Sequence, residues 1–192
     1  MKIHYFVHRF FEKCFDLYFT FRCNISAKLW GVKIKYAKFS GRTHFRKYPG
    51  SIIKIGNNCL FNSSRYSNQV GIYSPCLIST INSKGRIEIG HNCGFSGTVI
   101  SSALSITIGD NVRCGANTLI TDTDYHTDDL RTGIDAPVII EDNVWLGYGV
   151  KVLKGVHIGK GSMIGAGSIV TKDIPAGVIA AGIPCKIIKE IK

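Results

Sequence analysis

The sequence predicts a parallel β-helix, a mainly β fold in which short strands wind into stacked triangular coils. Two observations carry this prediction: a six-residue period over 140–175, and a turn-forming residue at a fixed place in each six. A period of six fits neither an amphipathic helix, which repeats about every 3.6 residues, nor the simple alternation of a strand. It fits a short flat strand followed by a corner, because Gly, Asn and Asp tolerate the positive φ that corners often need.

The repeat is regular at its first and fourth places. The aliphatic first places are Ile140, Leu146, Val152, Ile158, Ile164 and Val170. The turn-forming fourth places are Asn143, Gly149, Gly155, Gly161, Gly167 and Asp173. Three sixes close a coil of about 18 residues whose leading aliphatic side chains point inward. One coil cannot bury its own inner face, so coils must stack by parallel pairing about 4.8 Å apart.

The N-terminal segment differs from the repeats. Aromatic side chains at near-helical spacing predict an amphipathic helix over 1–30, which would cover the open end of the first coil. The alternative is a basic, aromatic anchor that makes peripheral contact with a membrane surface. A basic connection over 31–50 would follow. We therefore divide the chain into an N-terminal helical and basic segment, 1–50, and a β-helix domain, 51–192.

The repeats keep poor register in one stretch and break in another. Residues 62–85 are polar, so we expect a loop or an irregular coil there. Ile140 lies 20 residues beyond Ile120, two more than a coil, and the residues between them are too polar to line a core. They predict one extruded loop over about 121–138. Loops on a rigid scaffold commonly carry function.

The charge balance limits the partners. The chain has 24 Lys and Arg against 13 Asp and Glu, a formal net charge of +11. Such a surface attracts polyanions, but no helix-turn-helix, zinc-finger or RNA-binding signature supports nucleic acid. Coenzyme A phosphates, an anionic glycan or the cytoplasmic membrane surface explain the charge better.

The cysteines indicate the compartment. Their number is seven, which is odd, and no C-x-x-C motif occurs, so they resemble small core residues in a reducing compartment. The apolar N-terminal stretch is interrupted by charged residues and has no cleavage site, which argues against a signal peptide. We expect a cytoplasmic protein, peripheral at the inner face of the membrane if the anchor alternative holds.

The C-terminal tract resembles the hexapeptide-repeat acyltransferases. The residues that carry the resemblance are the runs 164–168, 171–175 and 181–185, IGAGS, TKDIP and AGIPC. It looks closest to the sugar and polysaccharide O-acetyltransferases that include galactoside and maltose acetyltransferases, and it covers about 50–192. The resemblance implies a left-handed β-helix and a homotrimer with active sites between subunits. It also implies acetyl-CoA as acyl donor and a hydroxyl of a sugar or bacterial surface glycan, of capsule or lipopolysaccharide type, as acceptor.

Acetyl transfer to a hydroxyl requires a base, because a sugar hydroxyl is a weak nucleophile near neutral pH. Of six histidines only His126 lies in the predicted loop. In the family resembled, the catalytic histidine sits just after the coil that precedes the motif at 143–147, and His126 matches that place. Asp122 or Asp124 could orient its imidazole, and each could equally be a solvated turn residue.

By resemblance, acetyl-CoA would lie along the edge of the C-terminal coils. The matching positions are Trp145, Gly147, Tyr148, Ala166, Gly167, Thr171, Lys172, Lys186 and Lys189. Trp145 would contact the pantetheine arm, although simple packing on the outer face is the alternative. Ser96 and Gly97 match an acceptor-side position. No metal site is expected.

Four other classes share this fold. A zinc hydrolase would need three histidines that meet at a subunit interface, and the predicted loop holds one. A serine acetyltransferase would carry a long helical domain that this chain lacks. An N-acetyltransferase acting on an amino sugar and a non-catalytic β-helix scaffold remain open as alternatives, and assays of transfer from acetyl-CoA separate them.

Overall fold

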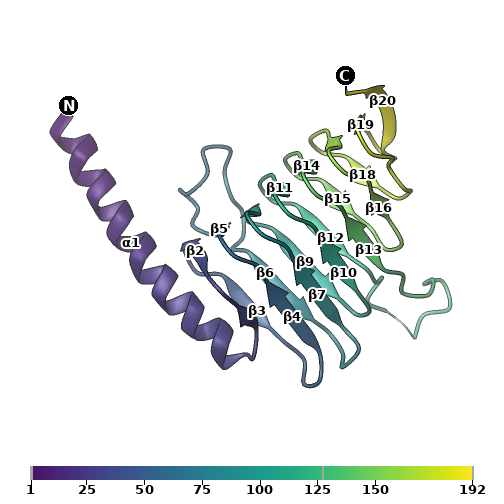
Figure 1. The fold of residues 1–192 in the computed structure, drawn as a ribbon, viewed down its shortest axis with the longest axis horizontal. Coiled ribbons are helices and arrows are strands. Elements are labelled where there is room, and N and C mark those ends of the chain that lie inside the picture. The colour runs from purple at the N-terminus through teal and green to yellow at the C-terminus, as the bar shows by residue number, and fades with distance from the viewer. Residues whose placement is uncertain (1, 127, 192) are drawn as a thin grey trace.

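The computed structural model describes residues 2–126 and 128–191, and it confirms the predicted class: a left-handed parallel β-helix behind one N-terminal helix, α1 (Lys2–Leu29) (Figure 1). Three sheets form the sides of the prism. Sheet A holds β1 (Lys33–Ile34), β4 (Ile52–Ile55), β7 (Arg86–Ile89), β10 (Ile106–Ile108), β13 (Val138–Ile140) and β16 (His157–Ile158). Sheet B holds β2 (Ala37–Ser40), β5 (Cys59–Asn62), β8 (Gly94–Ser96), β11 (Arg113–Cys114), β14 (Trp145–Leu146), β17 (Met163–Ile164), β19 (Val178–Ala181) and β20 (Lys186–Glu190). Sheet C holds β3 (His44–Arg46), β6 (Leu77–Thr80), β9 (Val99–Ser102), β12 (Leu119–Thr121), β15 (Lys151–Val152) and β18 (Ile169–Val170).

The predicted inward aliphatics form the core. All six leading residues of the repeats over 140–170 are fully buried. Ile140 pairs with Ile158 and Leu146 with Ile164 in parallel register, which is the expected spacing of one coil. The N-terminal coils use larger side chains: the rings of Phe39, Phe61 and Phe95 stack inside the prism with centroids 5.0–5.1 Å apart.

Asparagine forms the corner between sheets A and B. Asn58, Asn92, Asn111 and Asn143 all have φ of 57–59°. Their side chains also bridge coils, since the Asn58 amide donates to Asn92 at 3.0 Å and the Asn92 amide to Asn111 at 3.3 Å. Short polar side chains therefore both tolerate the left-handed turn and satisfy one another along this corner.

The first coil starts earlier than expected. Residues 31–50, predicted as a basic connection, contain β1, β2 and β3, which pair with β4, β5 and β6. The coils therefore begin at Lys33, ahead of the division that we predicted at residue 50. The lysines of this stretch point outward and hide the alternation, while Ala37, Phe39 and Phe45 enter the core.

Helix α1 covers the edge of sheet B at the open end of the prism. Thr20 Oγ1 accepts the Phe39 N–H at 3.0 Å, and the Asn24 amide donates to the Ala37 carbonyl at 3.2 Å. These helix side chains satisfy backbone groups of β2 that would otherwise be unpaired at an edge strand. Among the described residues, no helix combines the length and hydropathy that crossing a membrane requires.

Candidate active site

The predicted extruded loop is present between β12 and β13, at the corner where sheet C leads to sheet A. Its base is fixed by Asp122, which is fully buried. The carboxylate of Asp122 accepts hydrogen bonds from Ser102 Oγ at 2.7 Å and from the N–H groups of Ala103 and Leu104 at 2.7 and 2.9 Å. The Ala136 N–H closes the loop by donating to the Asp122 carbonyl at 3.1 Å.

His126 lies on the exposed part of this loop. Its carbonyl accepts hydrogen bonds from the Asp129 N–H at 3.0 Å and from Thr132 Oγ1 at 2.9 Å, so its backbone is anchored. Within 2–126 and 128–191 its imidazole forms no hydrogen bond or ion pair. The ring is therefore held on a fixed backbone with its nitrogens available to a ligand.

The residue before His126 has an unusual backbone. Tyr125 has φ of 68°, although it is neither Gly nor Asn, and its N–H donates to Thr123 Oγ1 at 3.1 Å. A left-handed conformation costs a bulky residue about 1–2 kcal/mol, and such strain gathers at functional sites. This turn sets the direction in which the next side chain, His126, leaves the loop.

The two predicted orienting carboxylates have other partners. The Asp122 carboxylate accepts its hydrogen bonds from residues 102–104. Asp124 is exposed and forms an ion pair with Lys154 at 2.5 Å, which ties the loop to the next coil. No hydrogen bond joins either carboxylate to the His126 imidazole among the described residues, so the orienting role remains a prediction.

Other histidines have structural partners. His157 Nε2 lies 2.8 Å from Glu141 Oε1 on the outer face of sheet A. The Lys160 N–H and then His157 hold the pKa of Glu141 below its ordinary value. His91 Nδ1 accepts the Asn57 N–H at 3.0 Å. Burial, followed by Arg42 and Arg46, lowers the pKa of His44.

The corner between sheets B and C carries many of the predicted cofactor positions. Gly147 and Tyr148 form it in one coil, and Ala166 and Gly167 in the next. The Gly167 N–H donates to the Tyr148 carbonyl at 2.7 Å. A Cβ on Gly147 would lie 2.7 Å from the Ala166 nitrogen, so only glycine lets these corners stack so closely. Ala166 and Gly167 are exposed and leave a narrow, accessible backbone edge.

The remaining cofactor positions surround this edge. Trp145 lies on the outer face of sheet B with half of its surface exposed. Thr171 and Lys172 are exposed after β18, and Lys186 and Lys189 are exposed on β20. The Cys185 N–H donates to the Ile169 carbonyl at 2.8 Å, which brings the chain before β20 beside β18.

A second loop, over 63–76, lies along the same corner. Its Tyr73 N–H donates to Asn117 Oδ1 at 2.9 Å, and the hydroxyls of Tyr148 and Tyr73 are 2.7 Å apart. This hydrogen bond raises the pKa of Tyr73. The loop thus spans from the second coil to the predicted cofactor edge. We expected only an irregular segment here; the polar run with its asparagines and tyrosines was the signal in the sequence.

Ser96 and Gly97, the predicted acceptor positions, lie beneath this second loop. Ser96 is buried, and its Oγ accepts amide hydrogen bonds from Asn62 at 3.2 Å and Asn68 at 3.1 Å. A Cβ on Gly97 would lie 2.7 Å from Ile72 Cγ2. In this structure both residues support the loop from below.

His126 and the predicted cofactor edge lie on opposite borders of sheet C. The loop of His126 leaves sheet C toward sheet A, whereas Tyr148 and Ala166 enter sheet C from sheet B. One subunit therefore brings the cofactor positions together but does not bring His126 to them.

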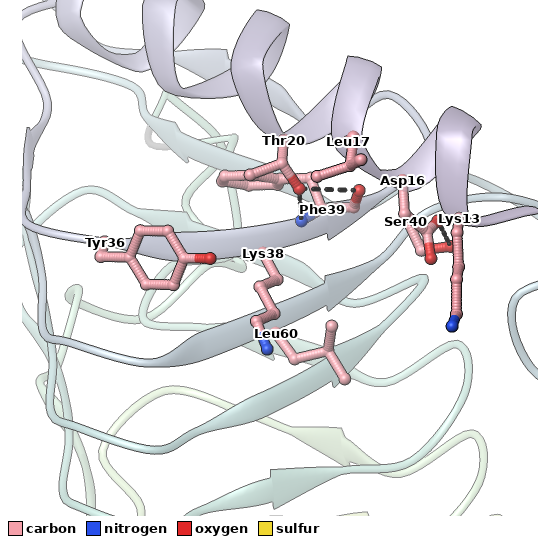
Figure 2. Close-up of a pocket in the computed structure, with 9 residues that line it drawn as sticks. All are labelled: Lys13, Asp16, Leu17, Thr20, Tyr36, Lys38, Phe39, Ser40 and Leu60. Carbon is pink, nitrogen blue, oxygen red and sulfur yellow. Dashed lines mark hydrogen bonds between the residues drawn. The ribbon is translucent and has the colours of Figure 1, made fainter.

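Neither of two surface pockets includes a predicted site residue. A pocket of about 330 Å³ lies within the second loop, between Arg65, Tyr73 and Pro75. A pocket of about 300 Å³ separates α1 from the first coil, where Lys13 and Lys38 border Tyr36 and Leu60 (Figure 2). Among the described residues, no three His, Cys, Asp or Glu side chains converge so that they could hold a metal ion.

Comparison with known proteins confirms the resemblance seen in the sequence. Residues 137–172 match the family described as bacterial transferase hexapeptide (six repeats). The chain is 44% identical over 112 residues to the galactoside O-acetyltransferase of Escherichia coli. The aligned segment covers 55% of each protein. It is 40% identical over 143 residues to the galactoside O-acetyltransferase of Lactococcus lactis, covering 72% of this chain and 63% of the relative. The chain thus spans about half to three fifths of the length of these curated relatives.

Solved structures share the fold. A variant of AntD, an N-acyltransferase from Bacillus cereus in complex with dTDP and coenzyme A, matches with a TM-score of 0.65 at 19% identity, covering 88% of this chain and 89% of that chain. At this identity the likeness shows the β-helix fold.

Proposed function

We propose that the protein is an acetyl-CoA-dependent O-acetyltransferase that acts on a hydroxyl of a sugar or bacterial surface glycan, with His126 as general base. The observation that carries the proposal is the exposed His126 imidazole, which has no partner among the described residues and stands on an extruded loop. The similarity to two galactoside O-acetyltransferases supports the reaction type. The seven free thiols support a reducing, cytoplasmic location.

Acetyl-CoA would lie along the corner between sheets B and C. Stacked glycine corners give close access to the backbone, and the exposed Trp145 offers a flat apolar face to the pantetheine arm. The exposed side chains of Lys172, Lys186 and Lys189 would meet the phosphates. Lysine supplies charge there without the bidentate geometry of arginine.

A second subunit would complete the site, since His126 and this corner face opposite borders of sheet C. The outer face of sheet C supports such packing: Leu77, Val99 and Leu119 stack in register and are half-buried in the isolated chain. A homotrimer in which the His126 loop of one subunit meets the cofactor corner of the next gives three equivalent sites, as closed symmetry requires.

The chemistry then needs one proton carrier. His126 takes the proton of the acceptor hydroxyl as its oxygen attacks the acetyl carbonyl, and a backbone N–H stabilises the oxyanion. The tetrahedral intermediate collapses, the C–S bond breaks, and His126 returns the proton to the coenzyme A thiolate. The products are the acetyl ester and free coenzyme A, with no acyl-enzyme.

The test is release of coenzyme A thiol from acetyl-CoA with a panel of sugars, amino sugars and surface glycans. We expect turnover with hydroxyl acceptors, and His126→Ala should lower it by about 10²- to 10⁴-fold with folding intact. His157→Ala is the matched control, because this histidine faces outward and pairs with Glu141.

An unchanged rate in His126→Ala would remove the general-base assignment. Turnover restricted to amino sugars would favour an N-acetyltransferase, and no turnover across the panel would favour a non-catalytic scaffold.

A further inference from the structure

Helix α1 attaches to the prism by one narrow side. Asp16, Thr20, Cys23 and Ala27, spaced three or four residues apart, lie on this side. Cys23 and Ala27 are buried, and Asp16 accepts a hydrogen bond from Ser40 Oγ at 2.7 Å. Toward its N-terminus α1 slants away from the coils (Figure 1). Much of the helix surface is therefore left to solvent in the single chain.

The side of α1 that faces away from the prism is apolar. With about 100° between successive residues, the exposed set lies roughly opposite the attached side. This set, the outer face of α1, consists of Phe10, Phe11, Tyr18, Phe21, Ile25 and Leu29, each 42–84% exposed. A surface helix ordinarily turns its apolar stripe to the core, and α1 does the reverse. An apolar face of this size indicates a binding surface.

Positive charge is concentrated in the same part of the chain. Residues 1–54 contain 12 Lys and Arg and two Asp and Glu. The whole chain has 24 Lys and Arg and 13 Asp and Glu, so residues 55–192 contain 12 basic and 11 acidic residues. The N-terminal part thus carries +10 of the net charge of +11, and the coils that hold the candidate site are nearly neutral.

We propose that the outer face of α1 docks on a membrane surface rich in anionic lipid. Aromatic and aliphatic side chains would enter the boundary between headgroups and acyl chains, and lysines and arginines of 1–54 would meet the phosphates. Nucleic acid is a poorer partner, because it would bind the positive charge but leave the apolar outer face of α1 exposed to water. A second copy would bring another +10 segment against the first, and the two would repel.

The experiment is sedimentation of the full chain with vesicles of phosphatidylcholine and phosphatidylglycerol in equal amounts, compared with phosphatidylcholine alone. We expect binding to the anionic vesicles that weakens as salt is raised, because the phosphate contacts are screened. Phe10→Ser with Phe21→Ser should reduce partitioning about tenfold or more, since two large apolar side chains no longer enter the lipid.

The matched control is Leu130→Ser with Ile188→Ser, which removes two apolar side chains, each at least 63% exposed, from the extruded loop and from β20. This control should bind as the wild type does, and circular dichroism should show intact folding in both double variants. Failure of the wild type to bind anionic vesicles, or equal loss in both variants, would overturn the proposal. Self-association without lipid that depends on Phe10 and Phe21 would assign the face to a second copy.

Docking is separate from catalysis. Phe10→Ser with Phe21→Ser should keep its turnover on a soluble acceptor, so a failure of membrane docking and a failure of the acetyltransferase proposal give different results.

Discussion

Asp122 and Asp124 lie two residues apart, yet their surroundings give them different roles. Asp122 is buried and accepts three hydrogen bonds from 102–104, whereas Asp124 is exposed and paired with Lys154. The sequence offers either one as a partner of His126, because it shows only that both are near His126 along the chain. The hydrogen bonds that Asp122 accepts from a neighbouring coil appear only in the folded structure.

Asp122→Ala should destabilise the protein strongly. Its loss leaves the backbone N–H groups of Ala103 and Leu104 without their acceptor, and a hydrogen bond to a charged group contributes about 1.5–3 kcal/mol. We expect the free energy of unfolding to fall by about 3 kcal/mol or more, measured by urea denaturation. Asp124→Ala, which removes an exposed pair, should change it by less than about 1 kcal/mol. Equal effects would contradict the division of roles.

The contacts of Glu141 predict that the free energy of unfolding depends on pH. Its folded-state pKa is depressed by the Lys160 N–H and by His157. A depressed carboxyl pKa stabilises the fold above the ordinary value of 4.5 and loses this contribution as pH falls through the folded value. The free energy of unfolding of the wild type should therefore drop more steeply below pH 4.5 than that of Glu141→Gln. Parallel curves between neutral and acidic pH would count against the assigned contacts.

At the scale of the element, regular repeats were predictable and irregular ones were not. The coils over 140–175 follow from six-residue spacing, which depends only on side-chain type and corner geometry. The first coil, 33–46, was not predicted because its outward lysines make the segment resemble a basic linker. The second loop, 63–76, was foreseen as irregular, but its course along the cofactor corner depends on long-range contacts such as Tyr73 with Tyr148.

Substitutions at Asn92 test the role of asparagine at the corner between sheets A and B. It has φ of 57° and exchanges side-chain hydrogen bonds with Asn58 and Asn111. Asn92→Ala should lower the free energy of unfolding by about 1–2 kcal/mol, because alanine is strained in the left-handed region. Asn92→Gly relieves that strain and should lower the free energy of unfolding by less, although both variants lose the side-chain hydrogen bonds to Asn58 and Asn111. Thermal or urea unfolding compares them, and a more stable alanine variant would refute the role of the turn.

At the scale of the molecule, the proposed activity requires residues from two subunits at each site. Each chain offers the His126 loop at one border of sheet C and the stacked glycine corners at the other. Both sets of residues are predicted from the sequence. Their separation by a full sheet is a property of the winding, so it emerges only when the strands are placed. Membrane docking through α1 would add a third region, at the end of the prism where the coils begin.

The most direct test is complementation between two inactive variants. His126→Ala removes the base, and Ala166→Trp places a bulky side chain on the exposed corner where acetyl-CoA would lie; each alone should show little turnover. When the two are co-expressed so that subunits mix, some sites combine an intact His126 with an intact corner from the neighbour. Random mixing in a trimer should restore about a quarter of wild-type turnover. Mixed assemblies as inactive as the separate variants would contradict a site shared between subunits.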